Sequence, residues 1–194
     1  MIQQFFKHYK IVLASNSPRR QELLRGLGFD FEIRVKPVDE SFPDHLMLQA
    51  VALYLCEKKS LAFSESELGA DELLITADTI VCLENEILNK PLDRPHAVEM
   101  LQKLSGRKHS VITGVCLRSK EKIHCFYDST DVYFRKLALA EIEYYVDHFH
   151  PFDKAGAYGI QEWIGLAAIK KINGSYFNVV GLPTEALFEA LKHF

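Results

Sequence analysis

The stretch IVLASNSPRRQELLRG, residues 11–26, indicates the fold class and raises the first question about function. Its first four residues are apolar and two of them are β-branched, which predicts a buried strand that ends at a polar loop. Ser17 is a favoured helix N-cap, so a helix is predicted over residues 18–26. Arg19 and Arg20 then place two cations at the positive end of the helix dipole, where each costs roughly 0.3–1 kcal/mol. A bound anion would remove that cost, because a helix N-terminus offers free N–H groups.

The rest of the chain continues as alternating strands and helices. FDFEIRV, residues 29–35, alternates apolar and polar side chains and completes a strand–helix–strand unit. Periodicity and turn signals predict helices over residues 44–63, 94–104, 139–148 and 183–192, and strands over residues 73–78, 80–83, 87–90, 109–119, 122–135 and 164–172. Residues 150–161 and 173–183 are predicted as loops. The pattern indicates an α/β domain with an elongated mixed sheet and flanking helices.

Composition limits the classes of protein that the chain can represent. It has 194 residues, of which 48% are hydrophobic and 25% charged, as in globular proteins with a packed core. The net charge of −3 disfavours a general nucleic-acid binder. Residues 1–15 lack a signal-peptide pattern and no apolar run is long enough to span a bilayer, so we expect a cytoplasmic protein without membrane contact. None of the cysteines is in a CxxC spacing, which favours buried free thiols at Cys56, Cys82, Cys116 and Cys125.

Several polar residues are candidates for chemistry, each with a structural alternative. Asp78 follows an apolar run and could bind Mg²⁺ or act as a general base, or it could cap a turn. Lys59 and Lys90 could contact phosphate, or they could lie on the surface as solvated cations. Gln161 closes the loop FDKAGAYGIQ and could read a base edge, although a structural turn is the alternative. P-loop and Rossmann fingerprints are absent from the sequence.

Nine segments occur in the order found in one known family. The segments are LASNSPRRQELL, VDES, EKKS, ADTIV, NKP, LSG, ITGV, PFDKAGAYGIQ and INGSYFNVVGLP, and they extend from about residue 11 to residue 190. The chain therefore resembles the Maf family of nucleoside triphosphate pyrophosphatases. The resemblance implies a single domain over residues 1–194 that is similar to inosine triphosphate pyrophosphatases, with two lobes around a central cleft and assembly as a homodimer. It also implies metal-dependent hydrolysis of a nucleoside triphosphate to the monophosphate and pyrophosphate.

The resemblance assigns roles to particular residues. The positions that match the family's active site are Ser15, Arg20, Glu40, Lys59, Asp78 and Lys90. Asp78 matches the proton acceptor, and together with Glu40 it would hold Mg²⁺ or Mn²⁺. Ser15 and Ser17 add hydroxyl groups for phosphate, and Lys58 is the alternative to Lys59 as the phosphate contact.

Base specificity is also implied by the resemblance. Arg19, Thr79 and Gln161 match the three positions that mark the subgroup acting on dTTP and UTP, whereas the 7-methyl-GTP subgroup carries Trp, Gln and Glu there. The expected partner is thus a nucleotide substrate, with no stable nucleic-acid complex. A 7-methyl-GTP or modified-nucleotide pyrophosphatase, and a nucleotide- or nucleic-acid-binding regulator of cell division, remain as alternatives. Trp163 could stack on a base or pack as a surface aromatic.

Overall fold

The computed structural model describes residues 9–194. The interpretation of residues 1–15 as lacking a signal peptide therefore falls largely outside the described residues. Among the residues that are described, none of the helices has the length and apolar character needed to cross a membrane.

Seven strands form a mixed sheet in the order β2-β1-β3-β5-β6-β7, with β4 paired to β3. Strand β1 pairs in parallel with β2 and β3, whereas the β3–β4 and β6–β7 pairs are antiparallel. This arrangement confirms the predicted α/β class with a mixed sheet and flanking helices. The strand bounds are β1 Lys10–Leu13, β2 Phe31–Ile33, β3 Glu72–Leu83, β4 Glu86–Leu88, β5 Lys108–Arg118, β6 Ile123–Phe134 and β7 Ile169–Asn173.

The chain folds into two compact units, and each is described by itself. Unit 1 contains the described residues up to Asp78 together with Thr113–Asp128 and Gly181–Phe194. Unit 2 contains Thr79–Ile112 and Ser129–Val180. The elongated shape, the central cleft and the single domain with two lobes stay predictions.

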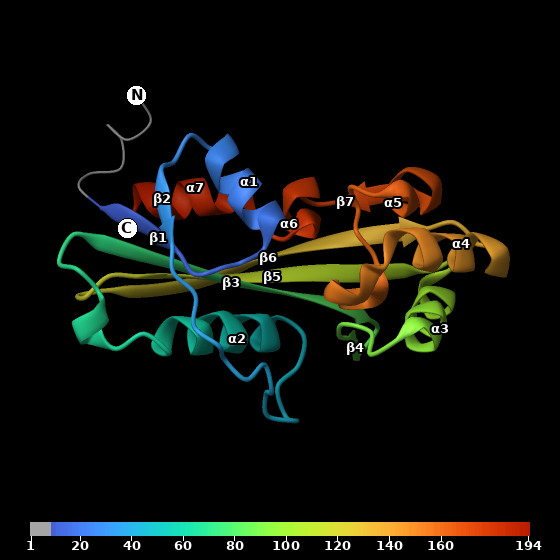
Figure 1. The fold of residues 1–194 in the computed structure, drawn as a ribbon, viewed down its shortest axis with the longest axis horizontal. Helices are drawn as coiled ribbons and strands as arrows, with labels where there is room; N and C mark the ends of the chain where they lie inside the picture. The colour runs from blue at the N-terminus through green and yellow to red at the C-terminus, as the bar shows by residue number, and fades with distance from the viewer. Residues whose placement is uncertain (1–8) are drawn as a thin grey trace. The chain divides into compact units, whose positions relative to one another are not determined.

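Unit 1 has helices on both faces of its strands. Helices α1 (Pro18–Gly26) and α7 (Thr184–Lys192) cover one face, and α2 (Gln49–Leu61) covers the opposite face (Figure 1). The core under α1 and α7 contains Leu24 and Leu187, which pack with apolar residues of β1, β3 and β5. A second, smaller cluster includes Phe63 and Leu74. The 3₁₀ helix η2 (Glu65–Glu67) follows α2.

Unit 2 is organised around an aromatic cluster. The rings of His109, Phe134 and Tyr158 contact one another edge to face with centroids 5.0–5.4 Å apart. Helices α3 and α4 of this unit pack against each other (Figure 1). The helix bounds are α3 Arg94–Leu104, α4 Leu139–Phe149, α5 Trp163–Ala168 and α6 Tyr176–Val180, with 3₁₀ helices η3 Pro151–Asp153 and η4 Ala155–Ala157.

Strand β3 corrects the predicted strand boundary at residue 78. The sequence interpretation ended a strand at Asp78 and began a hairpin strand at Ile80, because a polar pair interrupts the apolar run. Instead, β3 continues through Asp78 and Thr79. Strand β3 is hydrogen-bonded to β5 as well, while its residues 72–75 pair with β1 and its residues 81–83 pair with β4.

Three further boundaries differ from the predictions. Helix α2 begins at Gln49 rather than at residue 44, because Leu48 has a positive φ of 49°. The apolar run 164–172 was predicted as a strand, but its first part is helix α5; short apolar runs do not distinguish the two states. Gly165 allows this helix to form, since an added Cβ would lie 1.8 Å from the Ile160 carbonyl oxygen. The predicted loop 173–183 contains α6.

Candidate active site

The N-terminus of helix α1 is capped by the serine-rich loop that precedes it. Ser17 Oγ accepts a hydrogen bond from the backbone N–H of Arg20 at 3.5 Å, and Pro18 occupies the first helical turn, as predicted. Ser17 N–H in turn donates to Ser15 Oγ at 3.2 Å. Gln21 Nε2 donates to the Ser15 carbonyl at 3.2 Å. The loop is therefore folded against the helix end and presents backbone and hydroxyl groups around a positive dipole.

The Arg20 side chain is bound to backbone at two distant points of unit 1. Its Nε donates to the Gly181 carbonyl and its Nη1 to the Ala77 carbonyl, each at 2.8 Å. Burial lowers the pKa of Arg20, and the nearby Asp78 carboxylate opposes that effect. The Arg19 guanidinium is close enough to lower the pKa of Arg20 further. Arg20 thus fixes the carbonyl group immediately before Asp78 and carries a positive charge beside it.

Lys59 joins two carboxylates that are far apart in the sequence. Its Nζ lies 2.7 Å from Glu40 Oε1 and 2.5 Å from Asp78 Oδ1. The Lys59 and Asp78 side chains are only 19% and 11% exposed, whereas Glu40 is 46% exposed. A shielded ammonium between two carboxylates is held by charge-assisted hydrogen bonds, which are stronger than neutral ones.

Lys58 has a different role from its neighbour. Its Nζ donates to the Ser41 carbonyl at 2.9 Å and lies 3.5 Å from Asp39, over the ring of Tyr54. The two adjacent lysines therefore attach the segment 39–41 to α2, and only Lys59 also contacts Asp78. This geometry favours Lys59 as the residue of the site, although its phosphate contact stays a prediction.

The carboxylate pair is a suitable partner for a divalent cation that arrives with a nucleotide. Within residues 9–194, His, Cys, Asp and Glu side chains do not gather in groups of three or more that could hold a metal ion. Mg²⁺ commonly takes one or two protein carboxylates and completes its shell with phosphate oxygens and water. Glu40 and Asp78 supply that number of carboxylates around one ammonium, so the donor set fits such an ion.

Arg20, Glu40, Lys59 and Asp78 form the unit 1 cluster. Thr79, Lys90 and Gln161 belong to unit 2, so their association with this cluster stays a prediction. Thr79 follows Asp78 directly in β3 and is partly buried. Lys90 and Gln161 are exposed.

The loop before Gln161 is held by a buried network that the sequence analysis missed. Lys154 is 9% exposed and its Nζ lies 2.7 Å from Asp153 and 3.1 Å from Glu162. Tyr145 OH donates to Glu162 and accepts the Gly159 N–H at 3.0 Å. Burial and the hydrogen bond to Glu162 raise the pKa of Tyr145, so the phenol stays protonated. Tyr145 is a buried residue of helix α4, and nothing in the local pattern marks it as polar support for a loop.

Gly156 in this loop and Trp163 at the start of α5 favour the structural alternatives weighed above. Gly156 has a positive φ of 67°, and an added Cβ would lie 2.9 Å from Val81 Cγ1, so its backbone approaches a core side chain. Trp163 packs edge to face on Tyr144 with ring centroids 5.1 Å apart. Both residues therefore contribute to packing within unit 2.

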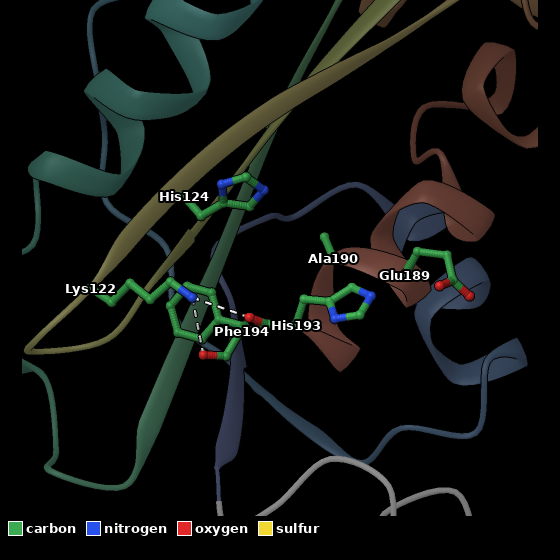
Figure 2. Close-up of a pocket in the computed structure, with 6 residues that line it drawn as sticks. All are labelled: Lys122, His124, Glu189, Ala190, His193 and Phe194. Carbon is green, nitrogen blue, oxygen red and sulfur yellow. Dashed lines mark hydrogen bonds between the residues drawn. The ribbon is translucent and has the colours of Figure 1, made fainter.

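A separate pocket of about 250 Å³ lies in unit 1 and contains none of the candidate residues. Figure 2 shows that it is lined by Lys122 and His124, at the start of β6, by Glu189 and Ala190 of α7, and by the two residues that follow α7. Lys122 Nζ donates to the carbonyls of His193 and Phe194 at 3.2 Å and lies over the Phe194 ring. The pocket is thus bordered by contacts that attach the end of the chain to β6.

The unit 1 cluster combines a capped helix N-terminus, buried cations and paired carboxylates on an α/β scaffold. Such a combination defines an enzyme class that handles phosphorylated substrates, since the cations suit phosphate oxygens and the carboxylates suit a metal ion or a proton. The chain belongs to the Maf family: the family model described as "Maf-like protein" matches residues 10–194.

Relatives and one solved structure are similar to the chain over much of its length. A dTTP/UTP pyrophosphatase of Bacteroides fragilis is 55% identical over 95% of both chains. A dTTP/UTP pyrophosphatase of Flavobacterium psychrophilum is 51% identical over 97% of this chain and 96% of its own. A nucleoside-triphosphatase / dITP/XTP pyrophosphatase structure from Mycobacterium abscessus matches with a TM-score of 0.40 and 14% identity, over 66% of this chain and 75% of that one.

Proposed function

We propose that this chain is a pyrophosphatase that hydrolyses dTTP and UTP to the nucleoside monophosphate and pyrophosphate. The observation that carries the proposal is the Lys59 ammonium held between Asp78 and Glu40, with the partly buried Arg20 side chain bound to the carbonyl before Asp78. The names of relatives that are 51–55% identical over nearly the whole chain support the choice of substrates. Under this proposal the arginines at the start of α1 are tolerated because the site accommodates a polyanion.

Asp78 is the proton acceptor in the proposed reaction. Its carboxylate is held rigidly in β3 by Lys59, and Arg20 fixes the preceding carbonyl. A water molecule aimed at the α-phosphorus transfers a proton to Asp78 as the bond to the pyrophosphate leaving group breaks. Arg20, Lys59 and the N-terminus of α1 stabilise the negative charge that grows on the leaving group.

A divalent cation, Mg²⁺ or Mn²⁺, would be held by Glu40 and Asp78 and by phosphate oxygens. When bound, it would supply Lewis-acid polarisation of the phosphates and neutralise part of their charge. Lys59 keeps the two carboxylates together in its absence.

We assign base recognition and the remaining phosphate contacts to six further candidate residues. Arg19, Thr79 and Gln161 would contact the pyrimidine, Lys90 would add a phosphate contact, and Ser15 and Ser17 would contribute hydroxyl groups. A homodimer in the cytoplasm, without a stable nucleic-acid or membrane partner, completes the proposal.

The test is pyrophosphate release from dTTP, UTP, CTP, GTP, 7-methyl-GTP and ATP with Mg²⁺ or Mn²⁺. We expect release from dTTP and UTP, and a drop of about 10²–10⁴-fold in kcat for Asp78→Asn, the usual contribution of a general base. Asp71→Asn is the matched control, because Asp71 is also paired with a lysine, Lys10, at 2.9 Å. Full turnover by folded Asp78→Asn would remove Asp78 as the base.

The same panel separates the alternatives. Preference for 7-methyl-GTP would change the base assignment and keep the chemistry. No release from any nucleotide, together with salt-dependent DNA binding by the folded protein, would favour a binding regulator.

A further inference from the structure

Three of the cysteines converge within unit 1, on the face of the sheet that α2 covers. Strands β5 and β6 form a hairpin in which Cys116 lies directly opposite Cys125. Two backbone hydrogen bonds fix this register: Ser119 N–H to the Lys122 carbonyl at 2.9 Å and Phe134 N–H to the Arg107 carbonyl at 3.0 Å. Opposite residues of antiparallel strands alternate between pairs that exchange backbone hydrogen bonds and pairs that do not. Cys116 and Cys125 form a pair of the second kind, in which the Cα atoms are about 4.5 Å apart. That separation lies within the range of about 4.4–6.8 Å spanned by disulfides.

Helix α2 places the third cysteine over this pair. Two contacts align the helix with β5: an added Cβ on Gly114 would lie 2.3 Å from the Ala52 carbonyl oxygen, and Arg118 Nη1 donates to the Ser60 carbonyl at 2.7 Å. On α2, Cys56 lies midway between Ala52 and Ser60. On β5, Cys116 lies midway between Gly114 and Arg118. Cys56 is therefore seated above Cys116.

The three thiols differ in accessibility and in hydrogen bonding. Cys56 and Cys116 are completely buried, whereas Cys125 is only partly buried. Hydrogen bonding with Cys116 and Cys56 lowers the pKa of Cys125 below its ordinary value. The same hydrogen bonds and burial raise the pKa values of Cys116 and Cys56. The Cys56 thiol also donates to the Leu53 carbonyl at 3.1 Å, whereas Cys116 lies directly opposite Cys125 in the hairpin.

We propose that Cys125 is a peroxide-reactive thiol and that Cys116 resolves its oxidised form into a cross-strand disulfide. Reactive cysteines of this kind are accessible and lie next to a second thiol, and Cys125 is the most accessible of the three and lies opposite Cys116. The inference concerns a modification site and does not depend on the proposed pyrophosphatase activity.

The reaction proceeds in two balanced steps. The Cys125 thiolate attacks one oxygen of hydrogen peroxide and forms an S–O bond while the O–O bond breaks. Hydroxide is released, and Cys125 becomes a sulfenic acid. The Cys116 sulfur then attacks the Cys125 sulfur, the S–O bond breaks, and the proton of Cys116 leaves with the oxygen as water. A dithiol such as dithiothreitol reduces the disulfide and restores both thiols.

The test is to treat the purified, reduced protein with hydrogen peroxide and count free thiols after denaturation. The wild type has four cysteines, and we expect the count to fall to two and to recover after dithiothreitol. Peptide mapping of the oxidised chain should join Cys116 to Cys125. Because this measurement uses the unmodified protein, it does not depend on how any variant folds.

Variants assign the roles of the individual thiols. Cys125→Ser should keep all its remaining thiols under the same treatment. Cys116→Ser should accumulate a sulfenic acid on Cys125 that dimedone traps. Cys82→Ser is the matched control and should still form the disulfide, since Cys82 is a buried cysteine of unit 2 whose pKa burial raises to about 11. Oxidation of Cys125→Ser at the wild-type rate would overturn the proposal, and a Cys56–Cys125 disulfide in the wild type would overturn the role of Cys116.

Discussion

Arg20 offers the most direct test of how the site is built. Its guanidinium reaches the carbonyls of Ala77 and Gly181 at the same time, each at 2.8 Å. Replacing Arg20 with lysine keeps the positive charge but leaves one ammonium group at the end of a shorter side chain. At most one of the two carbonyls then keeps its partner, because lysine lacks the planar fork that binds two acceptors.

The loss can be estimated from the hydrogen bond that disappears. A hydrogen bond to a charged group contributes about 1.5–3 kcal/mol. For a chain of this size each kcal/mol shifts the melting temperature by about 2–4 °C, so Arg20→Lys should lower Tm by roughly 3–12 °C.

Calorimetry and urea unfolding measure this change directly. Arg25→Lys on the same helix is the matched control, since Arg25 is exposed, donates to the Gln21 side chain at 3.3 Å and lies over the Phe31 ring without binding two backbone carbonyls. We expect the control to unfold within about 0.5 kcal/mol of the wild type, as is usual for exposed positions. Equal stabilities of Arg20→Lys and Arg25→Lys would refute the reasoning, because Arg20 would then contribute only its charge.

Three further predictions follow from packing, burial and the carboxylate pair. Gly114→Ala should lower the free energy of unfolding by about 1–3 kcal/mol or more, because the new Cβ meets the Ala52 carbonyl. Urea unfolding measures this change, with Gly26→Ala as the control because its added Cβ meets open space. Burial lowers the pKa of His109 to about 4, so between pH 6.5 and pH 4 this histidine binds a proton in the unfolded chain but not in the folded one. The free energy of unfolding should therefore fall by up to about 1.4 kcal/mol per pH unit as the pH drops from 6.5 toward 4. Unfolding measured across that pH range should show a shallower slope for His109→Gln than for the exposed-site control His45→Gln; equal slopes would contradict it. A chelator should abolish pyrophosphate release without shifting Tm, since Lys59 already joins the two carboxylates, and a large shift in Tm would indicate a structural metal ion instead.

Local chemistry made some elements predictable. Helix α1 has the predicted bounds because its N-cap and first-turn proline act within a few residues. The break predicted at Asp78 was wrong because β3 is hydrogen-bonded to three other strands, β1, β4 and β5, and the polar pair itself carries no sign of that pairing. Residues 164–168 were assigned to the wrong state because a short apolar run is compatible with both strand and helix.

The candidate site shows the same division between local and long-range information. Ser15, Ser17 and the arginines were recognisable from the pattern of one helix start. The anchoring of Arg20 by Gly181 depends on a contact between residues 161 positions apart, which no local pattern encodes. Family resemblance supplied Glu40 and Lys59 as site residues, and the fold places Lys59 between Glu40 and Asp78. Tyr145 and Glu162 were missed because their hydrogen bond forms only when α4 packs against the loop.

The close contact between Gly114 and Ala52 has a consequence for how freely the sequence can vary. Helix α2 rests there with its backbone directly on the backbone of β5, so its height above the sheet does not depend on the size of an intervening side chain. Lys59 belongs to this helix. Exchanges among apolar side chains elsewhere in the core should therefore leave the ammonium position unchanged, whereas Gly114 itself should accept almost no replacement. Libraries that diversify the core while holding Gly114 fixed should retain far more active members than libraries that vary it.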